Sequence, residues 1–231
     1  MQKMSKVMMK PSAMLAPLPA VMVSCGRPED GTDNIITIAW TGIINSDPPR
    51  TYVSVMPRRW SHDVIEKSGV FVINLVPESL AFAMDWCGCV SREKEYKFGT
   101  HSLASGPDGE AKFALTCEKA ENVDCAAVKE SPVQIECRVF EKKSLGSHDM
   151  FLADIVGVRV DESVMTPEGR IAMERLGLVS LIHGSYYAAP KARIGRMGFS
   201  VMKPDTKKKL SAQYRAKYLI RKQGKEQFDK A

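Results

Sequence analysis

The chain has 231 residues, of which 44% are apolar and 26% charged, so it can bury the core of one ordinary domain. This composition excludes a collagen-like or wholly disordered chain, and no apolar run approaches the roughly 20 residues of a transmembrane helix. The net charge of +6 is uneven, because residues 203–231 hold ten Lys and Arg against three Asp and Glu. The basic balance therefore describes the tail and says little about the body of the chain.

The amino terminus superficially resembles a secretory signal, because three lysines precede an apolar stretch that ends near Cys25. Three prolines interrupt that stretch, so we predict a cytoplasmic protein instead. The six cysteines lack the paired C-x-x-C spacing of a zinc site, and the four histidines form no metal spacing. Cys87 and Cys89 are the one close pair, and we expect them to be partly buried free thiols.

The first half of the chain is predicted to begin with an antiparallel hairpin. Residues 20–26 are strand-like, and the turn at residues 27–33 leads into a strand expected over Asn34–Ile44. The prolines of Asn45–Pro49 must break this strand, because proline cannot donate to a ladder. A second strand, Thr51–Met56, follows and stops at Pro57.

The junction after that strand has the composition of an anion site. Ser61 is expected to cap a helix that ends at Ser68-Gly69, and Arg58 precedes it by three residues. A helix start offers unpaired N–H groups, and the arginine adds a forked cation, so together they could hold a phosphate. The alternative is a plain cap beside a solvated arginine, and Asp63 in the first turn favours that alternative because it competes with an anion.

The remainder is predicted to consist mostly of strands. We expect a buried strand at 70–76, a helix at 78–86, a surface loop at 88–101 and a loop at 105–112. Long strands are expected at 131–142 and 148–164, then a short helix at 166–178 and irregular structure at 178–200. Many short strands with few helices indicate a mainly antiparallel barrel, and the absence of a βαβ rhythm disfavours a doubly wound sheet.

The order of several motifs from Pro19 to Val201 resembles the flavin reductase-like family, the FMN-binding split barrels that include flavoredoxins. The matching residues include Asn34, Thr37, Trp40, Ser46-Asp47-Pro48-Pro49, Arg58, Ser61, Lys97-Phe98, Gly146-Ser147-His148 and Gly184-Ser185-Tyr186. The resemblance implies a mainly β, Greek-key split barrel with a few peripheral helices. It predicts a flavin reductase-like domain at 12–202 and a homodimer with FMN at its interface. The family pattern ends before residues 203–231, whose own composition and spacing predict a basic helical extension.

The same resemblance assigns the cofactor-binding residues and implies no catalytic side chain and no metal. Arg58 and Ser61 would hold the phosphate, and Lys97 and Phe98 would approach the flavin from a loop. The remaining assigned residues would lie along the flavin and its ribityl chain: Asn34, Thr37, Ala39, Trp40, Thr41, Asn45, Ser46, Val55 and Met56. The family commonly has Ser-Gly, and an Asp before Lys-Phe, whereas here Arg92 follows Ser91 and Tyr96 precedes Lys97. The nicotinamide pocket therefore departs from the family pattern.

We predict an NAD(P)H:flavin oxidoreductase that transfers hydride between NADH or NADPH and FMN, since such a reaction needs no protein nucleophile. An alternative is a flavoredoxin-like electron carrier or ferric reductase that a protein partner reduces; small molecules are the other possible electron acceptors. A third hypothesis uses the tail, where residues 207–219 have the spacing of a basic amphipathic helix that could bind nucleic acid. We favour packing of this helix on the barrel or on a second subunit.

Overall fold

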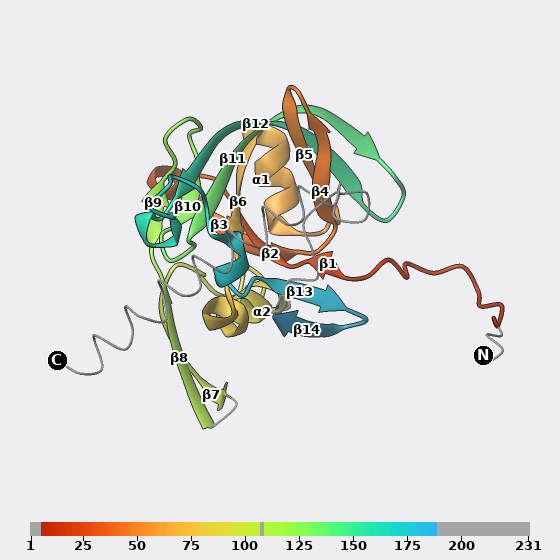
Figure 1. Cartoon of the computed structure of the whole chain (residues 1–231), viewed down its shortest axis with the longest axis horizontal. Helices are drawn as coiled ribbons and strands as arrows, with labels where there is room; N and C mark the ends of the chain where they lie inside the picture. Colours follow the sequence, from red (N-terminus) through yellow and green to blue (C-terminus); the bar gives the residue numbers. More distant parts are fainter. Residues whose placement is uncertain (1–5, 107–108, 189–231) are drawn as a thin grey trace, which may run out of the picture. The chain divides into compact units, whose positions relative to one another are not determined.

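A computed structural model describes residues 6–106 and 109–188 of the chain (Figure 1). The predictions for residues 189–200 and for the basic tail lie outside this part. Two α-helices are described, α1 (Trp60–Ser68) and α2 (Ala81–Cys89). Four 3₁₀ turns accompany them: η1 (Pro28–Asp30), η2 (Glu78–Leu80), η3 (Glu162–Val164) and η4 (Met173–Arg175).

Seven antiparallel strands form the central sheet in the order β3-β2-β6-β11-β12-β5-β4. Their bounds are β2 (Val21–Cys25), β3 (Asn34–Ile38), β4 (Thr41–Ser46), β5 (Pro49–Val55), β6 (Val70–Leu75), β11 (Val133–Ser144) and β12 (Asp149–Val160). Smaller sheets join β1 (Leu18–Pro19), β13 (Val179–Ile182) and β14 (Ser185–Ala188), and pair β7 (Gly99–Gly106) with β8 (Gly109–Leu115) and β9 (Cys117–Lys119) with β10 (Ala126–Val128). The mainly antiparallel class is as expected.

The outermost strands of this sheet, β3 and β4, follow each other directly in the chain. Only Ala39 and Trp40 separate them, so the two edges of the sheet must lie close together and the sheet must curl. The Ser54 N–H donates to the Trp40 carbonyl at 3.0 Å and helps to hold this crossing. The expected single strand over 34–44 is therefore wrong, because the chain leaves one edge of the sheet and joins the other.

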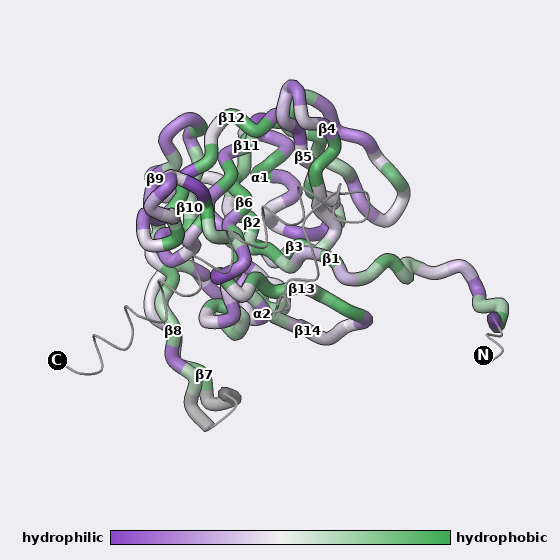
Figure 2. The backbone as a smooth tube through the Cα atoms, in the orientation of Figure 1, coloured by the Kyte–Doolittle hydropathy of each residue, from purple (hydrophilic) through white to green (hydrophobic). Residues whose placement is uncertain are grey.

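Both faces of the sheet are covered, which explains why β2 is buried along its whole length. Val21 and Val23 face a core that also contains Ile65 of α1, whereas Met22 faces a second core with Met84 of α2. Apolar residues follow the strands of the sheet in Figure 2, and Figure 1 shows α1 against one side of it. Alternate residues of β2 thus present apolar side chains on both faces of the sheet, and one helix packs against each set.

The N-cap of helix α1 is Arg59, two residues before the predicted cap Ser61; the helix begins at Trp60, and Arg59 makes no side-chain cap hydrogen bond. Ser61 is therefore not the cap; its side chain is turned into the protein and is fully buried. The predicted end is confirmed, because Gly69 takes the left-handed conformation with φ 69° and its N–H donates to the Ile65 carbonyl.

Four other local predictions are corrected. The loop expected at 88–101 includes the end of α2 and the start of β7, and residues 105–112 belong to the β7–β8 hairpin apart from the two undescribed residues. Between 166 and 178 only the short turn η4 is helical, since Gly169 and Gly177 take positive φ values of 73° and 56°. The irregular stretch from 178 contains β13 and β14 instead.

Candidate functional site

The junction between β5 and α1 forms one wall of a cavity of about 320 Å³, the inner cavity. Pro57 ends the strand and turns the chain so that the next residues lie at the helix start. The lining residues are Asn34, Ile36, Arg58, Arg59, Trp60, Ser61, Val90, Ser91, Arg92 and Lys97. Four of the predicted residues, Asn34, Arg58, Ser61 and Lys97, thus come together from separate parts of the chain.

The lining of the inner cavity is strongly positive, with three arginines, one lysine and no carboxylate. The Arg59 Nη1 donates to the Gly88 carbonyl at 3.2 Å, and the Arg92 Nε donates to the Asp33 carbonyl at 3.1 Å. Within the described part of the chain no carboxylate pairs with Arg58, whose Nη2 lies 3.6 Å from the Met56 sulfur. Carbonyl dipoles orient these cations without neutralising them, so the cavity is built to attract an anion.

Lys97 is a buried cation, since the residue is only 3% exposed. Its Nζ donates to the carbonyls of Ile35 and Cys87, each at 2.6 Å. Burial, with smaller contributions from the nearby guanidinium groups of Arg59 and Arg92, lowers the pKa of Lys97 to about 8. An anion in the inner cavity would oppose both effects and stabilise the protonated form.

Asn34 and Ser61 place uncharged polar groups in the same cavity. Both residues are buried, and the Asn34 Nδ2 donates to the Ser61 Oγ at 2.8 Å. The Asn34 Oδ1 is buried and has no hydrogen-bond partner among the described residues. An unsatisfied buried acceptor costs roughly 1–3 kcal/mol, a cost that a ligand group donating a hydrogen bond to Asn34 would remove.

The predicted residues on and beside β4 lie apart from the inner cavity. Trp40 is 42% exposed, and its ring centroid is 4.4 Å from that of His148. The Thr41 Oγ1 donates to the Tyr52 carbonyl, and the Asn45 Nδ2 donates to the Pro48 carbonyl at 2.8 Å. The side chains of Thr41 and Asn45 therefore stabilise the β4–β5 hairpin, while Trp40 offers an exposed aromatic surface. Ala39 and Met56 are partly buried and Ser46 is exposed.

Three other predicted residues have side chains that point into the protein. Val55 belongs to the core that contains Ile65, and Phe98 belongs to the core under α2. The Thr37 Oγ1 donates to the Met84 carbonyl at the contact between β3 and α2. None of the three lines the inner cavity. They position the chain segments that carry Asn34 and Lys97.

Arg59 and Arg92 line the site but were not predicted from the sequence, where Arg92 stood only as a departure from the family pattern. Arg92 reaches across to the carbonyls of Gly31 and Asp33, and its guanidinium stacks over the Tyr96 ring at 4.7 Å. Arg59 stands next to Arg58, and its proximity to the site could have been inferred from that adjacency alone.

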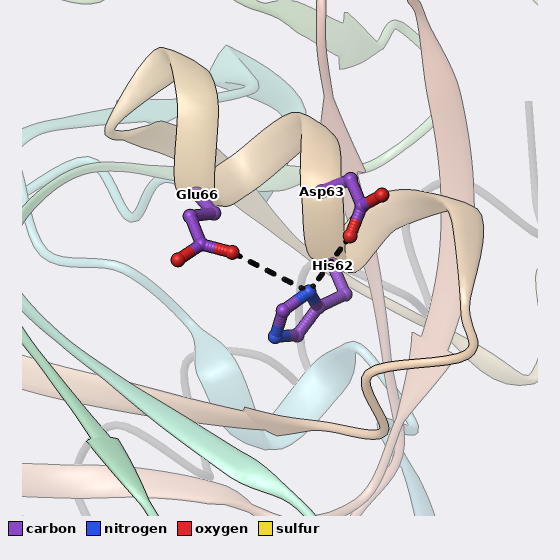
Figure 3. Close-up of side chains that lie close together, drawn as sticks. All are labelled: His62, Asp63 and Glu66. Atoms are coloured by element: carbon purple, nitrogen blue, oxygen red, sulfur yellow. Dashed lines mark hydrogen bonds and ion pairs between the residues drawn. The ribbon is translucent and has the colours of Figure 1, made fainter.

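A separate cluster on α1 anchors the helix that carries the site. The His62 Nδ1 lies 3.0 Å from the Asp63 Oδ1 and 3.8 Å from the Glu66 Oε2 (Figure 3). Its Nε2 lies 2.8 Å from an Asp149 carboxylate oxygen on β12. The ligand atoms of His62, Asp63 and Glu66 are close enough to share a metal ion. Since Lys142 also pairs with Glu66, the cluster ties α1 to the sheet and fixes the position of Ser61.

No helix in residues 6–106 and 109–188 is both long and apolar enough to span a membrane.

Comparisons with known proteins agree with this architecture. The family model that describes the flavin reductase like domain matches residues 14–180 of the sequence. Flavoredoxin of Desulfovibrio vulgaris (Miyazaki F) is 24% identical, with a TM-score of 0.70 over 85% of this chain and 100% of that one. An FMN-binding protein from Thermus thermophilus is 20% identical, with a TM-score of 0.62 over 85% and 100%. A putative flavin reductase with a split barrel domain from Shewanella frigidimarina is 21% identical, with a TM-score of 0.62 over 78% and 86%. The fold is thus a split barrel, and the chain belongs to the flavin reductase-like domain family.

Proposed function

We propose that this protein binds FMN and works as an NAD(P)H:flavin oxidoreductase. The observation that carries this proposal is the inner cavity, where four cations meet at the start of α1 and no carboxylate lines the wall. A phosphate monoester carries a charge of about −1.5 to −2 at pH 7, which this lining would neutralise. The family and the FMN-binding protein of similar fold support a flavin as the source of that phosphate.

The residues of the inner cavity suit the polar end of FMN. Arg58, Arg59 and Lys97 would hold the phosphate oxygens, and Ser61 is within the first turn of α1. The unpartnered Asn34 Oδ1 would accept a hydrogen bond from a ribityl hydroxyl. Bound FMN would supply the redox chemistry by accepting a hydride, so the chain has only to bind and orient the cofactor.

The surface formed by the end of β3, Trp40 and β4 is the proposed position of the flavin ring, as the family resemblance implies. Its surface is apolar and open: Trp40 is 42% exposed, Ile43 71% and Ile44 46%. Exposed apolar side chains that gather on one edge strand favour coverage by another surface. We propose that a second copy of the chain covers them, so that FMN lies at the interface of a cytoplasmic homodimer.

A second candidate function is a flavoredoxin-like electron carrier that a protein partner reduces. Arg92 favours it, because this residue occupies the loop where the family commonly has glycine. The similar fold of a flavoredoxin is also consistent with it. Anaerobic mixing of the FMN-loaded protein with NADH and with NADPH separates the two functions. Bleaching of the flavin absorbance within the mixing time supports the reductase, and an unchanged spectrum supports the carrier.

FMN binding itself is tested by the substitution Arg58→Ala, with Arg159→Ala as the matched control. Arg159 lies on β12 and pairs with Glu118 away from the inner cavity. A charge-assisted hydrogen bond contributes about 1.5–3 kcal/mol, so the FMN dissociation constant should rise roughly 10- to 150-fold. Fluorescence titration measures it. Equal dissociation constants for wild type and Arg58→Ala would contradict the assignment of the phosphate site.

A further inference from the structure

We propose that Arg92 and Tyr96 are positioning residues, which hold the loop that carries Lys97 against the start of β3 and so form the phosphate site before a ligand is bound. This inference rests on the proposed function, which places the FMN phosphate in the inner cavity. The loop comprises residues 90–98 and connects α2 to β7; it is called the clamp loop below. It contributes Val90, Ser91, Arg92 and Lys97 to the lining of the inner cavity.

Side chains attach the clamp loop to the segment that leads into β3. The backbone of the loop turns back on itself, since the Glu95 N–H donates to the Ser91 carbonyl at 3.1 Å. The Arg92 Nε donates to the Asp33 carbonyl at 3.1 Å, and its Nη2 donates to the Gly31 carbonyl at 3.3 Å. One guanidinium thus fixes the loop to two points of the chain before β3.

Tyr96 makes a further attachment, to a buried acid. Its hydroxyl donates to the Asp33 Oδ2 at 2.6 Å, and Asp33 is only 1% exposed. The central guanidinium carbon of Arg92 lies 4.7 Å from the centroid of the Tyr96 ring, so each side chain limits the movement of the other. Asp33 directly precedes Asn34, and Tyr96 directly precedes Lys97. The bond between residues 33 and 96 therefore fixes the backbones of Asn34 and Lys97 relative to each other.

These are the two positions at which the loop departs from the family pattern. The family commonly has glycine in place of Arg92, and glycine has no side chain that could reach the Asp33 carbonyl. It commonly has aspartate in place of Tyr96, and a second carboxylate would be repelled by the buried Asp33. The two departures belong together, because both side chains contact Asp33 and each other.

The position of Lys97 explains why the loop needs these attachments. Its Nζ donates to two carbonyls while the residue is buried, so the ammonium is already in place in the ligand-free protein. The titratable and charged groups that act on it are Arg59, Arg92, Cys25 and Cys87. The two guanidinium groups repel the ammonium, and this repulsion favours opening of the loop. A loop held closed by Arg92 and Tyr96 does not have to be ordered when the phosphate binds.

The test compares Tyr96→Phe and Arg92→Lys with the wild type and the control Tyr187→Phe. Tyr96→Phe removes only the hydroxyl, and Arg92→Lys keeps the charge but loses the planar fork that reaches two carbonyls and stacks on the ring. Tyr187 is 52% exposed on β14 and does not line the inner cavity. Hydrogen exchange of the flavin-free proteins measures opening of the clamp loop. Amides of residues 90–98 should exchange about 10-fold faster in both loop variants, and at the wild-type rate in the control.

Fluorescence titration of FMN from pH 6.5 to 9.5 shows whether the closed loop positions Lys97. In the wild type and the control, affinity should fall above pH 8, because burial lowers the pKa of Lys97 to about 8. An open loop returns this pKa toward about 10.4, so affinity in the loop variants should stay nearly constant up to pH 9.5. It should also be about 10-fold weaker at pH 7, since only the closed fraction binds. Burial and the hydrogen bond to Asp33 raise the pKa of Tyr96, so its hydroxyl donates throughout this range.

Wild-type exchange in either folded loop variant overturns the inference. Faster exchange that leaves both the FMN affinity and its fall above pH 8 unchanged also overturns it, because the loop would then be held without effect on the phosphate site. If one variant does not fold, the other decides. A wild type that binds no FMN, together with faster exchange in the loop variants, would instead refute the proposed function and leave the attachment of the loop by Arg92 and Tyr96 established.

Discussion

FMN binding should weaken as the pH rises above 8, because Lys97 loses its proton there. Burial lowers the pKa of this side chain in the flavin-free protein to about 8. Because this pKa lies near 8, the side chain is mostly charged below pH 8 and mostly neutral above it. Bound phosphate favours the charged form, and FMN binding at higher pH must therefore take up a proton.

The size of the effect follows from this linkage. Above the pKa, each pH unit costs about 1.4 kcal/mol, a factor of ten in the dissociation constant. Between pH 8 and 9.5 the constant should rise about 15-fold, because half of the lysine is already deprotonated at pH 8. The phosphate itself has its second pKa near 6 and arginine stays protonated, so neither contributes to the change in this range.

The assay is fluorescence titration of FMN from pH 6.5 to 9.5 with wild type, Lys97→Met and the control Lys129→Met. Lys129 is an exposed residue that does not line the inner cavity. Lys97→Met should bind more weakly at pH 7 and show no slope above pH 8, whereas Lys129→Met should follow the wild type. A wild-type constant that does not change with pH, or the same slope in Lys97→Met, would refute the placement of the phosphate beside Lys97.

Three further predictions concern the core and the thiols. Asn74→Leu should lower the free energy of unfolding by about 2–4 kcal/mol in urea titrations, because the buried amide donates to Ser24 and accepts from the Val128 N–H; an unchanged midpoint would contradict this. Cys89, which is exposed, should react rapidly with a thiol reagent, whereas burial raises the pKa of Cys87 to about 12 and should make it slow. The double substitution Cys87→Ser, Cys89→Ser should leave FMN affinity unchanged, and loss of FMN from the folded variant would show that the thiols shape the site.

Residue patterns predicted the elements whose determinants are local. The alternation of apolar residues identified β11 and β12, and Gly69 marked the end of α1. The break at Ala39 and Trp40 could not be seen, because the apolar run continues through it. That break exists because two edges of a curled sheet meet there, and this depends on β11 and β12, which begin about 90 and 110 residues later in the chain.

Some residues of the candidate site could likewise be predicted from the sequence, whereas others depend on contacts between distant segments. Arg58 and Ser61 were selected by their spacing, and the structure places both at the inner cavity, although Ser61 is a buried partner of Asn34 and no helix cap. The burial of Lys97 and the reach of Arg92 to the carbonyl of Asp33 depend on how the segment after α2 folds back over β3. Neither a period nor a spacing in the sequence encodes such a contact.

The strand order also constrains how a growing chain can fold. The hairpins β2–β3 and β4–β5 are made early, but β12, the strand that joins β5 to β11, ends only at Val160. Until the ribosome has released that segment, the β4–β5 hairpin has no neighbour in the central sheet beyond itself, and its long-range contacts are among the last to form. Chains stopped before Asp149 should accordingly be cleaved by protease within residues 41–55, and full-length chains should resist cleavage there.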